Sequence, residues 1–183
     1  MKRYIRFVFN RNDLIKARAY IKSSDKTQDY GYIDFIEDIA LKQTKIICHI
    51  RGLKINKDQD QNIHAIHIHE FNNDMKCCSE LGGHYNPLKK EHGGRTIEVN
   101  GTTIINPNRH VGDLGNIEVD TNGNCDLEFV DPMIHLSGLH SVMNRSVVIH
   151  RDKDDLGLGG FDDSKITGHA GERIAYGLIQ WIC

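Results

Sequence analysis

Eight short segments rich in isoleucine, valine, tyrosine and phenylalanine recur along this chain of 183 residues, and their apolar residues often alternate with polar ones. An alternation with a period of two is typical of β-strands that bury one face. An Asn122-Gly123 pair separates two of the segments and signals a β-hairpin turn. About eight short strands in one domain favour an antiparallel sandwich or barrel. The predicted strands are Ala17–Ile21, Gly31–Phe35, Lys45–Arg51, His64–Glu70, Asn116–Asp120, Cys125–Val130, Arg145–His150 and Ile174–Ile182.

Two long stretches do not follow the strand pattern. Phe71–Arg109 contains several glycines and two histidines, and Arg151–Gly171 contains glycines and five aspartates. Loops of this length inside a compact domain are usually functional or disordered. Asp162–Lys165 could form a short helix, which the surrounding glycines disfavour. The length suits one domain, so we divide the chain into an N-terminal extension, residues 1–15, and one β-barrel domain, residues 16–183.

Composition and charge exclude several classes of protein. No apolar run approaches the roughly 18 residues of a membrane-spanning helix, so no membrane association is expected. The N-terminus has no apolar stretch long enough for a signal peptide, which predicts a cytoplasmic protein. A formal net charge of -2 argues against a nucleic-acid partner. The five cysteines show no CxxC spacing and are expected to be reduced thiols: Cys48, Cys77, Cys78, Cys125 and Cys183.

Eleven histidines point instead to metal or proton chemistry. In His67-Ile68-His69, a strand directs both imidazoles to one face, where they can reach a single metal ion. This motif alone would also fit two surface histidines, but other candidates surround it. Neutral imidazole is the commonest metal ligand near neutral pH. The further candidate ligands lie in the long loops or at strand ends: His64, His84, His92, His110, Asp113 and His150.

The number and type of these residues indicate two metal ions. Three histidines and one aspartate would suit a closed tetrahedral zinc site. A set of imidazoles alone suits copper, zinc, iron or nickel, with copper highest in the affinity series. Even six of these seven histidines, together with one aspartate, exceed the needs of one four-coordinate ion, whereas two ions that share a ligand would use those six and the aspartate.

The order of these motifs resembles the copper/zinc superoxide dismutase family, in its cytoplasmic type. The resemblance covers about Lys45 to Ile179, and more loosely reaches back to Ala17. Each motif alone would be weak, but the whole set in this order, with family-like spacing apart from one longer loop, is very specific. It implies a Greek-key β-barrel with two long functional loops beside one metal site. The matching stretches are His67–Phe71, Gly83–Pro87, His92–Gly94, His110–Asn116, His150–Gly160 and Thr167–Arg173.

The resemblance also implies a role for individual residues. His84 would be shared by the two metals, and Asp154 would link a copper histidine to a zinc histidine. His64 would support the site without binding metal, and Arg173 would line the copper channel. The implied copper ligands are His67, His69, His84 and His150. The implied zinc ligands are His84, His92, His110 and Asp113.

The activity implied is disproportionation of superoxide to dioxygen and hydrogen peroxide, as an antioxidant defence. Copper would accept an electron from one superoxide anion and reduce a second. His84 would take up and release a proton as its bond to copper breaks and re-forms, while zinc holds it. Arg173 would guide and orient the anion, since a guanidinium is planar and always charged. An inactive dismutase-like domain that stores or delivers metal is the alternative. A zinc hydrolase is disfavoured, because the chain lacks an HExxH motif.

Several residues depart from the family pattern. Tyr176 stands where the family has one cysteine of an internal disulfide, so Cys78 could be free or could pair with Cys48, Cys125 or Cys183; Cys77 offers a second thiol beside it. The loop between His92 and His110 is longer than usual, and Asn100–Asn108 looks like an added outward excursion. Ile166 replaces a common steering lysine, which predicts weaker or redirected steering of the substrate.

A symmetric homodimer is a further implication of the resemblance. Trp181 is the only tryptophan of the chain, and an aromatic anchor suits an interface. The alternative is that Trp181 packs against its own barrel. By position, the contact would involve Asn72, Met143, Asn144, Leu178 and Trp181.

Overall fold

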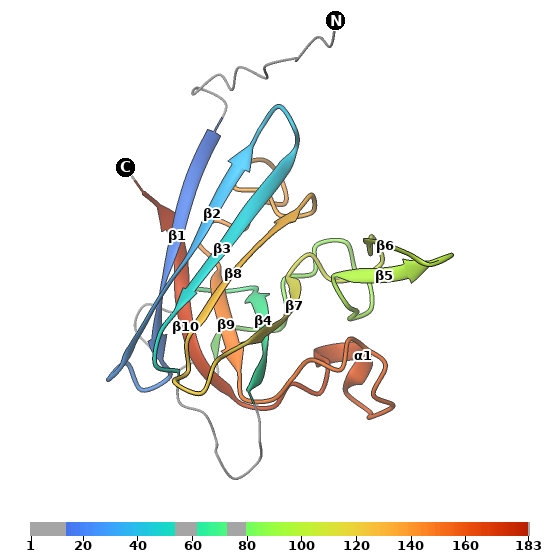
Figure 1. Cartoon of the computed structure of the whole chain (residues 1–183). Helices are drawn as coiled ribbons and strands as arrows, with labels where there is room; N and C mark the ends of the chain where they lie inside the picture. Colours follow the sequence, from blue (N-terminus) through green and yellow to red (C-terminus); the bar gives the residue numbers. More distant parts are fainter. Residues whose placement is uncertain (1–13, 54–61, 73–79, 183) are drawn as a thin grey trace, which may run out of the picture.

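The structure, a computed structural model, describes residues 14–53, 62–72 and 80–182, and its main feature is one antiparallel sheet of eight strands (Figure 1). The order within the sheet is β7-β4-β9-β10-β1-β2-β3-β8. Each predicted strand overlaps one of these eight strands, so the all-β prediction is confirmed. The strands are β1 (Leu14–Ser23), β2 (Asp29–Asp38), β3 (Gln43–Ile50), β4 (Ile63–His69), β7 (Asp113–Glu118), β8 (Cys125–Asp131), β9 (Ser146–His150) and β10 (Arg173–Trp181).

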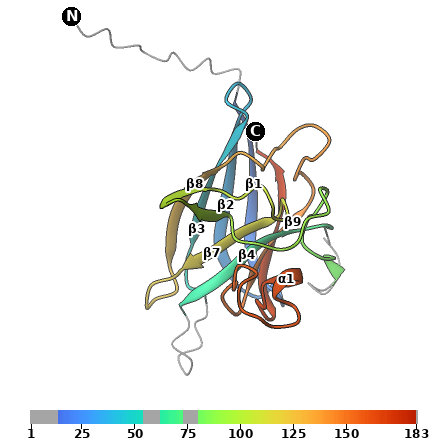
Figure 2. The ribbon, with the colours of Figure 1, turned by 90° about the vertical axis from the view of Figure 1, so that its right-hand side faces the viewer.

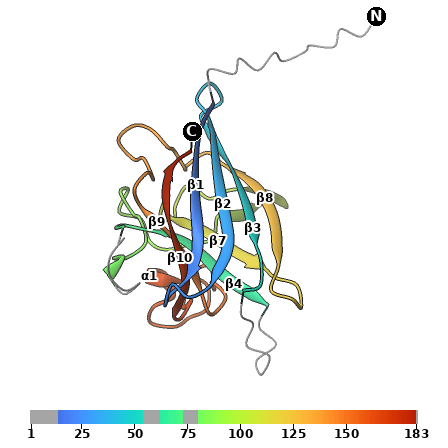
Figure 3. The ribbon, with the colours of Figure 1, turned by 90° about the vertical axis from the view of Figure 1, so that its left-hand side faces the viewer.

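The sheet curls into a nearly closed barrel around an aliphatic core. Figure 3 shows β10, β1, β2, β3 and β8 side by side along one wall. Alternate residues of β1 and β2, such as Ile21, Ile33 and Phe35, are fully buried. Inward side chains of β9 and β10, such as Ile149 and Ile179, belong to the same core. Strands far apart in sequence, β3 and β8, are hydrogen-bonded neighbours, as a Greek-key order requires.

The first long loop contains a hairpin that the sequence analysis did not predict. Its strands are β5 (Thr96–Val99) and β6 (Thr102–Ile105), which pair only with each other. Asn100 and Gly101 both have positive φ values, 51° and 76°, as a tight hairpin turn requires. The hairpin projects away from the barrel (Figure 1), in line with the expected outward excursion. This exposed two-stranded ribbon buries little apolar surface, and its Asn100-Gly101 pair between β-branched residues is the sequence signal that indicates it.

The second long loop runs from β9 to β10 and includes one short helix, α1 (Ser164–Thr167), which lies below β4 and β7 in Figure 2. The helix overlaps the expected Asp162–Lys165 and ends at Gly168, whose φ is 68°. No helix of the described residues is long and apolar enough to cross a membrane.

The structure also bears on the cysteines and on the N-terminal boundary. Cys48 and Cys125 are buried free thiols, so a pairing of Cys78 with either is wrong: both point into the packed core of the barrel. Cys77, Cys78 and Cys183 lie outside the described residues. The first strand begins at Leu14, and the division at residue 16 stays a prediction.

Candidate metal centre

The centre is built on the outer face of β4. Ile66 and Ile68 point into the barrel core, so His67 and His69 point the opposite way. Both imidazoles are nevertheless buried, at 0% and 1% exposure, because residues of the two long loops lie against them. The plain alternation of buried and exposed residues seen in β1 is therefore absent from β4.

Backbone hydrogen bonds around Ile68 join three segments that carry candidate ligands. The Ile68 amide donates to the carbonyl of Gly112 at 2.8 Å, and the Tyr85 amide donates to the carbonyl of Ile68 at 2.7 Å. The Gly112 amide in turn donates to the carbonyl of Tyr85 at 2.9 Å. A Cβ at position 112 would lie 2.2 Å from the Ile68 oxygen, so this approach requires glycine. The neighbours of these three residues, His67, His69, His84 and Asp113, are thereby brought together.

Four buried histidines form the first cluster: His67, His69, His84 and His150. One nitrogen of each lies within 4.8 Å of the others. Nδ1 of His69 donates to the carbonyl of Gly82 at 3.0 Å, and Nδ1 of His150 donates to that of Gly171 at 3.1 Å. Both Nε2 atoms therefore present lone pairs, and these lie 3.3 Å apart. Two acceptors that face each other suit a cation between them.

Electrostatics favour the neutral form of three of these imidazoles, those of His69, His84 and His150. Burial, followed by the neighbouring imidazoles, holds the pKa of His69 and His150 well below the usual value. Burial and the adjacent His67 also lower the pKa of His84 to about 3. A neutral imidazole is the form that binds a metal ion.

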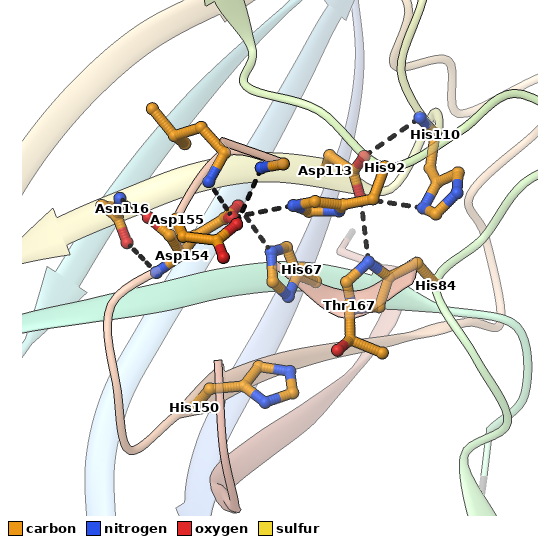
Figure 4. Close-up of polar contacts among 12 residues, drawn as sticks. His67, His84, His92, His110, Asp113, Asn116, His150, Asp154, Asp155 and Thr167 are labelled. Carbon is orange, nitrogen blue, oxygen red and sulfur yellow. Dashed lines mark hydrogen bonds and ion pairs between the residues drawn. The ribbon is translucent and has the colours of Figure 1, made fainter. Parts of the chain in front are cut away.

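The second cluster surrounds the carboxylate of Asp113 (Figure 4). Its Oδ1 lies 2.9, 3.1 and 3.2 Å from the Nδ1 atoms of His84, His92 and His110, respectively. Its Oδ2 accepts from the amides of Gly93 and His110. Burial would raise the pKa of Asp113, but the three imidazoles hold it well below its usual range. The four residues whose ligand atoms all lie within 4.8 Å of one another here are His67, His84, His92 and Asp113, and His110 joins them only through its contact with Asp113.

Asp154 joins the two clusters through opposite oxygens of one carboxylate (Figure 4). His67 Nε2 donates to Oδ2 at 3.0 Å, and His92 Nε2 donates to Oδ1 at 2.7 Å. Burial lowers the pKa of His92, but the adjacent carboxylates of Asp113 and Asp154 outweigh burial and raise it to about 9. The carboxylate thus fixes two imidazoles with their Nδ1 atoms directed to the metal clusters.

Unsatisfied nitrogens test whether metals fit these residues. The Nδ1 atoms of His67, His92 and His110 are buried and form no hydrogen bond of good geometry within the described part of the chain, although those of His92 and His110 lie close to the Asp113 carboxylate. Such groups are costly unless something binds them. Imidazoles and one carboxylate suit zinc, and imidazoles alone suit copper. The two clusters therefore fit a copper ion and a zinc ion.

The remaining predicted residues lie beside the clusters. His64 is buried and donates from Nδ1 to the carbonyl of His150 at 3.0 Å, so it contacts the site through backbone. Arg173 begins β10 opposite His150 of β9. The sequence analysis gave no role to Asn116, whose amide exchanges two hydrogen bonds with the backbone of Asp154. Spacing carries no signal for such a contact, because it joins a strand residue to the backbone of a loop 38 residues further along the chain.

Comparisons with known proteins agree with this chemistry. A family model described as copper/zinc superoxide dismutase (SODC) matches residues 29–179. An extracellular superoxide dismutase [Cu-Zn] of Drosophila melanogaster is 41% identical over 172 residues, covering 92% of this chain and 87% of the relative. One of Caenorhabditis elegans is 40% identical, covering 92% and 70%. A superoxide dismutase [Cu-Zn] of Humicola lutea is 37% identical over 166 residues, covering 91% and 98%.

The names of these relatives correct one prediction. The relatives from Drosophila melanogaster, Caenorhabditis elegans and Haemonchus contortus are all named extracellular. The predicted cytoplasmic location is therefore wrong, and the cytoplasmic type of the family is not supported. The prediction depended on the first residues of the sequence, which do not determine the location of the protein.

Proposed function

Since this chain belongs to the copper/zinc superoxide dismutase family, we propose that its two metals share the imidazole of His84. The protein is a superoxide dismutase, an oxidoreductase with copper and zinc as its cofactors. The proposed copper ligands are His67, His69, His84 and His150. The proposed zinc ligands are His84, His92, His110 and Asp113.

One observation carries this proposal: His84 lies in both clusters. Its Nδ1 faces the Asp113 carboxylate at 2.9 Å. Its ring centroid lies 3.9 Å from that of His67 and 5.1 Å from that of His69. His67 also takes part in both groups, but its Nε2 is engaged by Asp154, which leaves one nitrogen for a metal. His84 is therefore the better candidate for a shared ligand.

Bound copper supplies the one-electron redox chemistry that converts one superoxide to dioxygen and another to peroxide. Peroxide formation needs protons, and we assign a proton-carrying role to Nε2 of His84, the nitrogen that points away from Asp113. Asp154 keeps the imidazoles of His67 and His92 oriented throughout, since both its oxygens are occupied. Burial of all these side chains limits the access of bulk water.

Arg173 is proposed to attract and orient superoxide. It lies opposite His150 in the β9–β10 pair, and its guanidinium donates to the carbonyl of Gly82. Ile166 is 63% exposed on α1 and carries no charge, while neighbouring Lys165 lies 3.6 Å from Glu91. A partly compensated lysine contributes less to the field that draws in an anion. The uncharged Ile166 and the partly compensated Lys165 therefore support the prediction that superoxide is attracted only weakly towards the site from this side.

The decisive experiment loads the full chain with copper and zinc and measures the disappearance of superoxide. We expect turnover in the doubly loaded protein and its loss in His84→Ala. Protein that carries both metals but shows no turnover would instead favour the alternative, a domain that stores or delivers metal. Metal content is measured on the same samples, so that an inactive protein is distinguished from an unloaded one.

We also propose a homodimer formed through the outer face of β1 and β10. A groove of about 680 Å³ on this face is lined by three tyrosines, Tyr20, Tyr32 and Tyr176, together with Leu178. Trp181 is 57% exposed at the end of β10, but it pairs with the core residue Ala17, so it lies on the side of the strand opposite Leu178 and outside this groove. Sedimentation should give a dimer that Leu178→Glu converts to a monomer. A monomeric unsubstituted protein would contradict the proposal.

The names of the three extracellular relatives support secretion of this chain as well. Expression in a eukaryotic host with the natural N-terminus, followed by assay of cells and medium, tests this. Activity in the medium is the expected result, and activity confined to the cells would contradict it.

A further inference from the structure

Arg109 has the largest fully buried side chain among the described residues. It directly precedes His110 in the loop that leads to Asp113. Arginine is rarely buried completely unless it is paired, because removing a charge from water is costly. Nothing in the sequence pattern marks Arg109, and its burial requires partners that satisfy its charge.

The guanidinium binds the backbone of the loop that follows it. Nη1 donates to the carbonyls of His110 at 3.0 Å, Val111 at 3.1 Å and Asp113 at 2.9 Å. Two of these three carbonyls belong to proposed zinc ligands. One planar group therefore fixes the path of the chain between His110 and Asp113.

Asp131 at the end of β8 fixes the guanidinium in turn. Its Oδ2 accepts from Nη2 of Arg109 at 2.5 Å, and both side chains are 0% exposed. Its Oδ1 accepts from the Met133 amide at 2.8 Å, so the carboxylate itself is held. Burial lowers the pKa of Arg109, and the negative charge of Asp131 opposes that shift. The loop is thus anchored to a strand of the barrel.

We propose that Arg109 and Asp131 are positioning residues for zinc, which hold His110 and Asp113 in their binding arrangement before the metal arrives. The proposal rests on the assignment of His110 and Asp113 as zinc ligands. It predicts a specific effect on zinc, because the hydrogen bonds of the guanidinium go to His110, Val111, Asp113 and Asp131, whereas the proposed copper ligands lie on β4, on β9 and at His84.

The test compares zinc and copper affinities of Arg109→Lys and Asp131→Asn, prepared as full chains without metal. Lysine keeps the charge, but one ammonium cannot satisfy three carbonyls and a carboxylate in the same geometry. We expect zinc binding to weaken by about 10- to 100-fold, the usual effect of losing a partner of a metal ligand. Copper affinity should stay that of the unsubstituted protein. Cobalt(II), used as a coloured probe for the zinc site, should show an altered visible spectrum in both variants.

Two controls separate positioning from general stability. Arg18→Lys alters another arginine–aspartate pair, Arg18–Asp34 on β1 and β2, and should leave zinc affinity unchanged. The double variant Arg109→Met/Asp131→Leu removes the buried charges together and should unfold at higher urea than Arg109→Met alone, while zinc stays weakly bound. If Arg109→Lys does not fold, zinc affinity is measured on this double variant instead.

The outcomes are distinguishable. If the variants are less stable but bind zinc and cobalt as the unsubstituted protein does, the pair is merely structural and the proposal is overturned. Asp113→Ala tests the underlying ligand assignment independently. If that variant keeps full zinc affinity, the zinc ligands themselves are wrong, whatever Arg109→Lys shows.

Discussion

The guanidinium of Arg173 donates a 2.6 Å hydrogen bond to the backbone carbonyl of Gly82, 91 residues earlier in the chain. The same carbonyl accepts the Nδ1 proton of His69. A single oxygen therefore fixes both the channel arginine and one imidazole of the copper cluster. It also sets the path of the chain two residues before His84. The positive charge of Arg173 is thereby held at a fixed distance from the imidazole of His69.

Replacing Arg173 by isoleucine should slow the reaction without removing the metals. The loss of the cation removes electrostatic attraction for superoxide, so kcat/KM should fall by about tenfold or more. Its dependence on ionic strength should become flatter. Arg173→Lys is the matched control and should retain part of the rate. Loss of copper or zinc from Arg173→Ile would show that the residue maintains the site instead.

Replacing Asp154 by asparagine should weaken both metals. The neutral amide can accept through one atom only, so either His67 or His92 loses its partner. Zinc affinity should fall by about 10- to 100-fold, measured by competition with a chelator. Asp155→Asn changes the adjacent carboxylate, which binds Ser164 instead, and serves as the control. Unchanged zinc affinity in Asp154→Asn would contradict the role given to this carboxylate.

The metal-free protein should lose stability on acidification. The pKa of His69, His84 and His150 is lower in the folded chain than in the unfolded one, so the unfolded chain binds protons first. This stability is present above about pH 6.5 and is lost as pH falls towards the folded values. His92 behaves oppositely: its contribution is present below about pH 6.5 and is lost as pH rises through about 9. Urea midpoints at several pH values measure the loss of stability at acid and at alkaline pH. A midpoint that rises on acidification would contradict the effect assigned to His69, His84 and His150.

Cys48 should resist thiol reagents in the native protein. Burial, with a smaller effect of Cys125, raises the pKa of its thiol to about 12, and the side chain is fully buried. Only the thiolate reacts, so alkylation should require unfolding. Mass spectrometry of the peptide that contains Cys48, with and without urea, reports the difference. Rapid labelling of this residue in the native state would disagree with the packing described here.

The strands could be predicted because their side chains alternate between core and solvent. β1 and β2 show this pattern clearly in the structure. β4 is buried on both faces, yet its isoleucines alternate with polar histidines, and this alternation predicts the strand. The β5–β6 hairpin was missed although Asn100-Gly101 lies between two runs of threonine and isoleucine. The Asn-Gly pair signals this turn, whereas the flanking residues are mostly exposed and lack the alternation of buried and exposed residues seen in the barrel strands.

The candidate ligands could be identified from residue type and from the resemblance, but their supports could not. Asp154 matched a known position, whereas Asn116 and Arg109 act through backbone groups of other residues. Contacts of that kind depend on where distant segments meet, and nothing in local spacing encodes them. Sequence patterns therefore predict the atoms that bind metals better than the atoms that hold the ligands.

The hairpin of β5 and β6 has a practical consequence. Its turn, Asn100-Gly101, projects from the barrel (Figure 1), while its base is closed by the bond from the Asn106 amide to the Arg95 carbonyl. A fluorophore, a biotin group or an electrode linker attached at this turn would sit apart from the catalytic histidines. The turn at Asn100-Gly101 is thus a site at which the protein could be immobilised while it remains active.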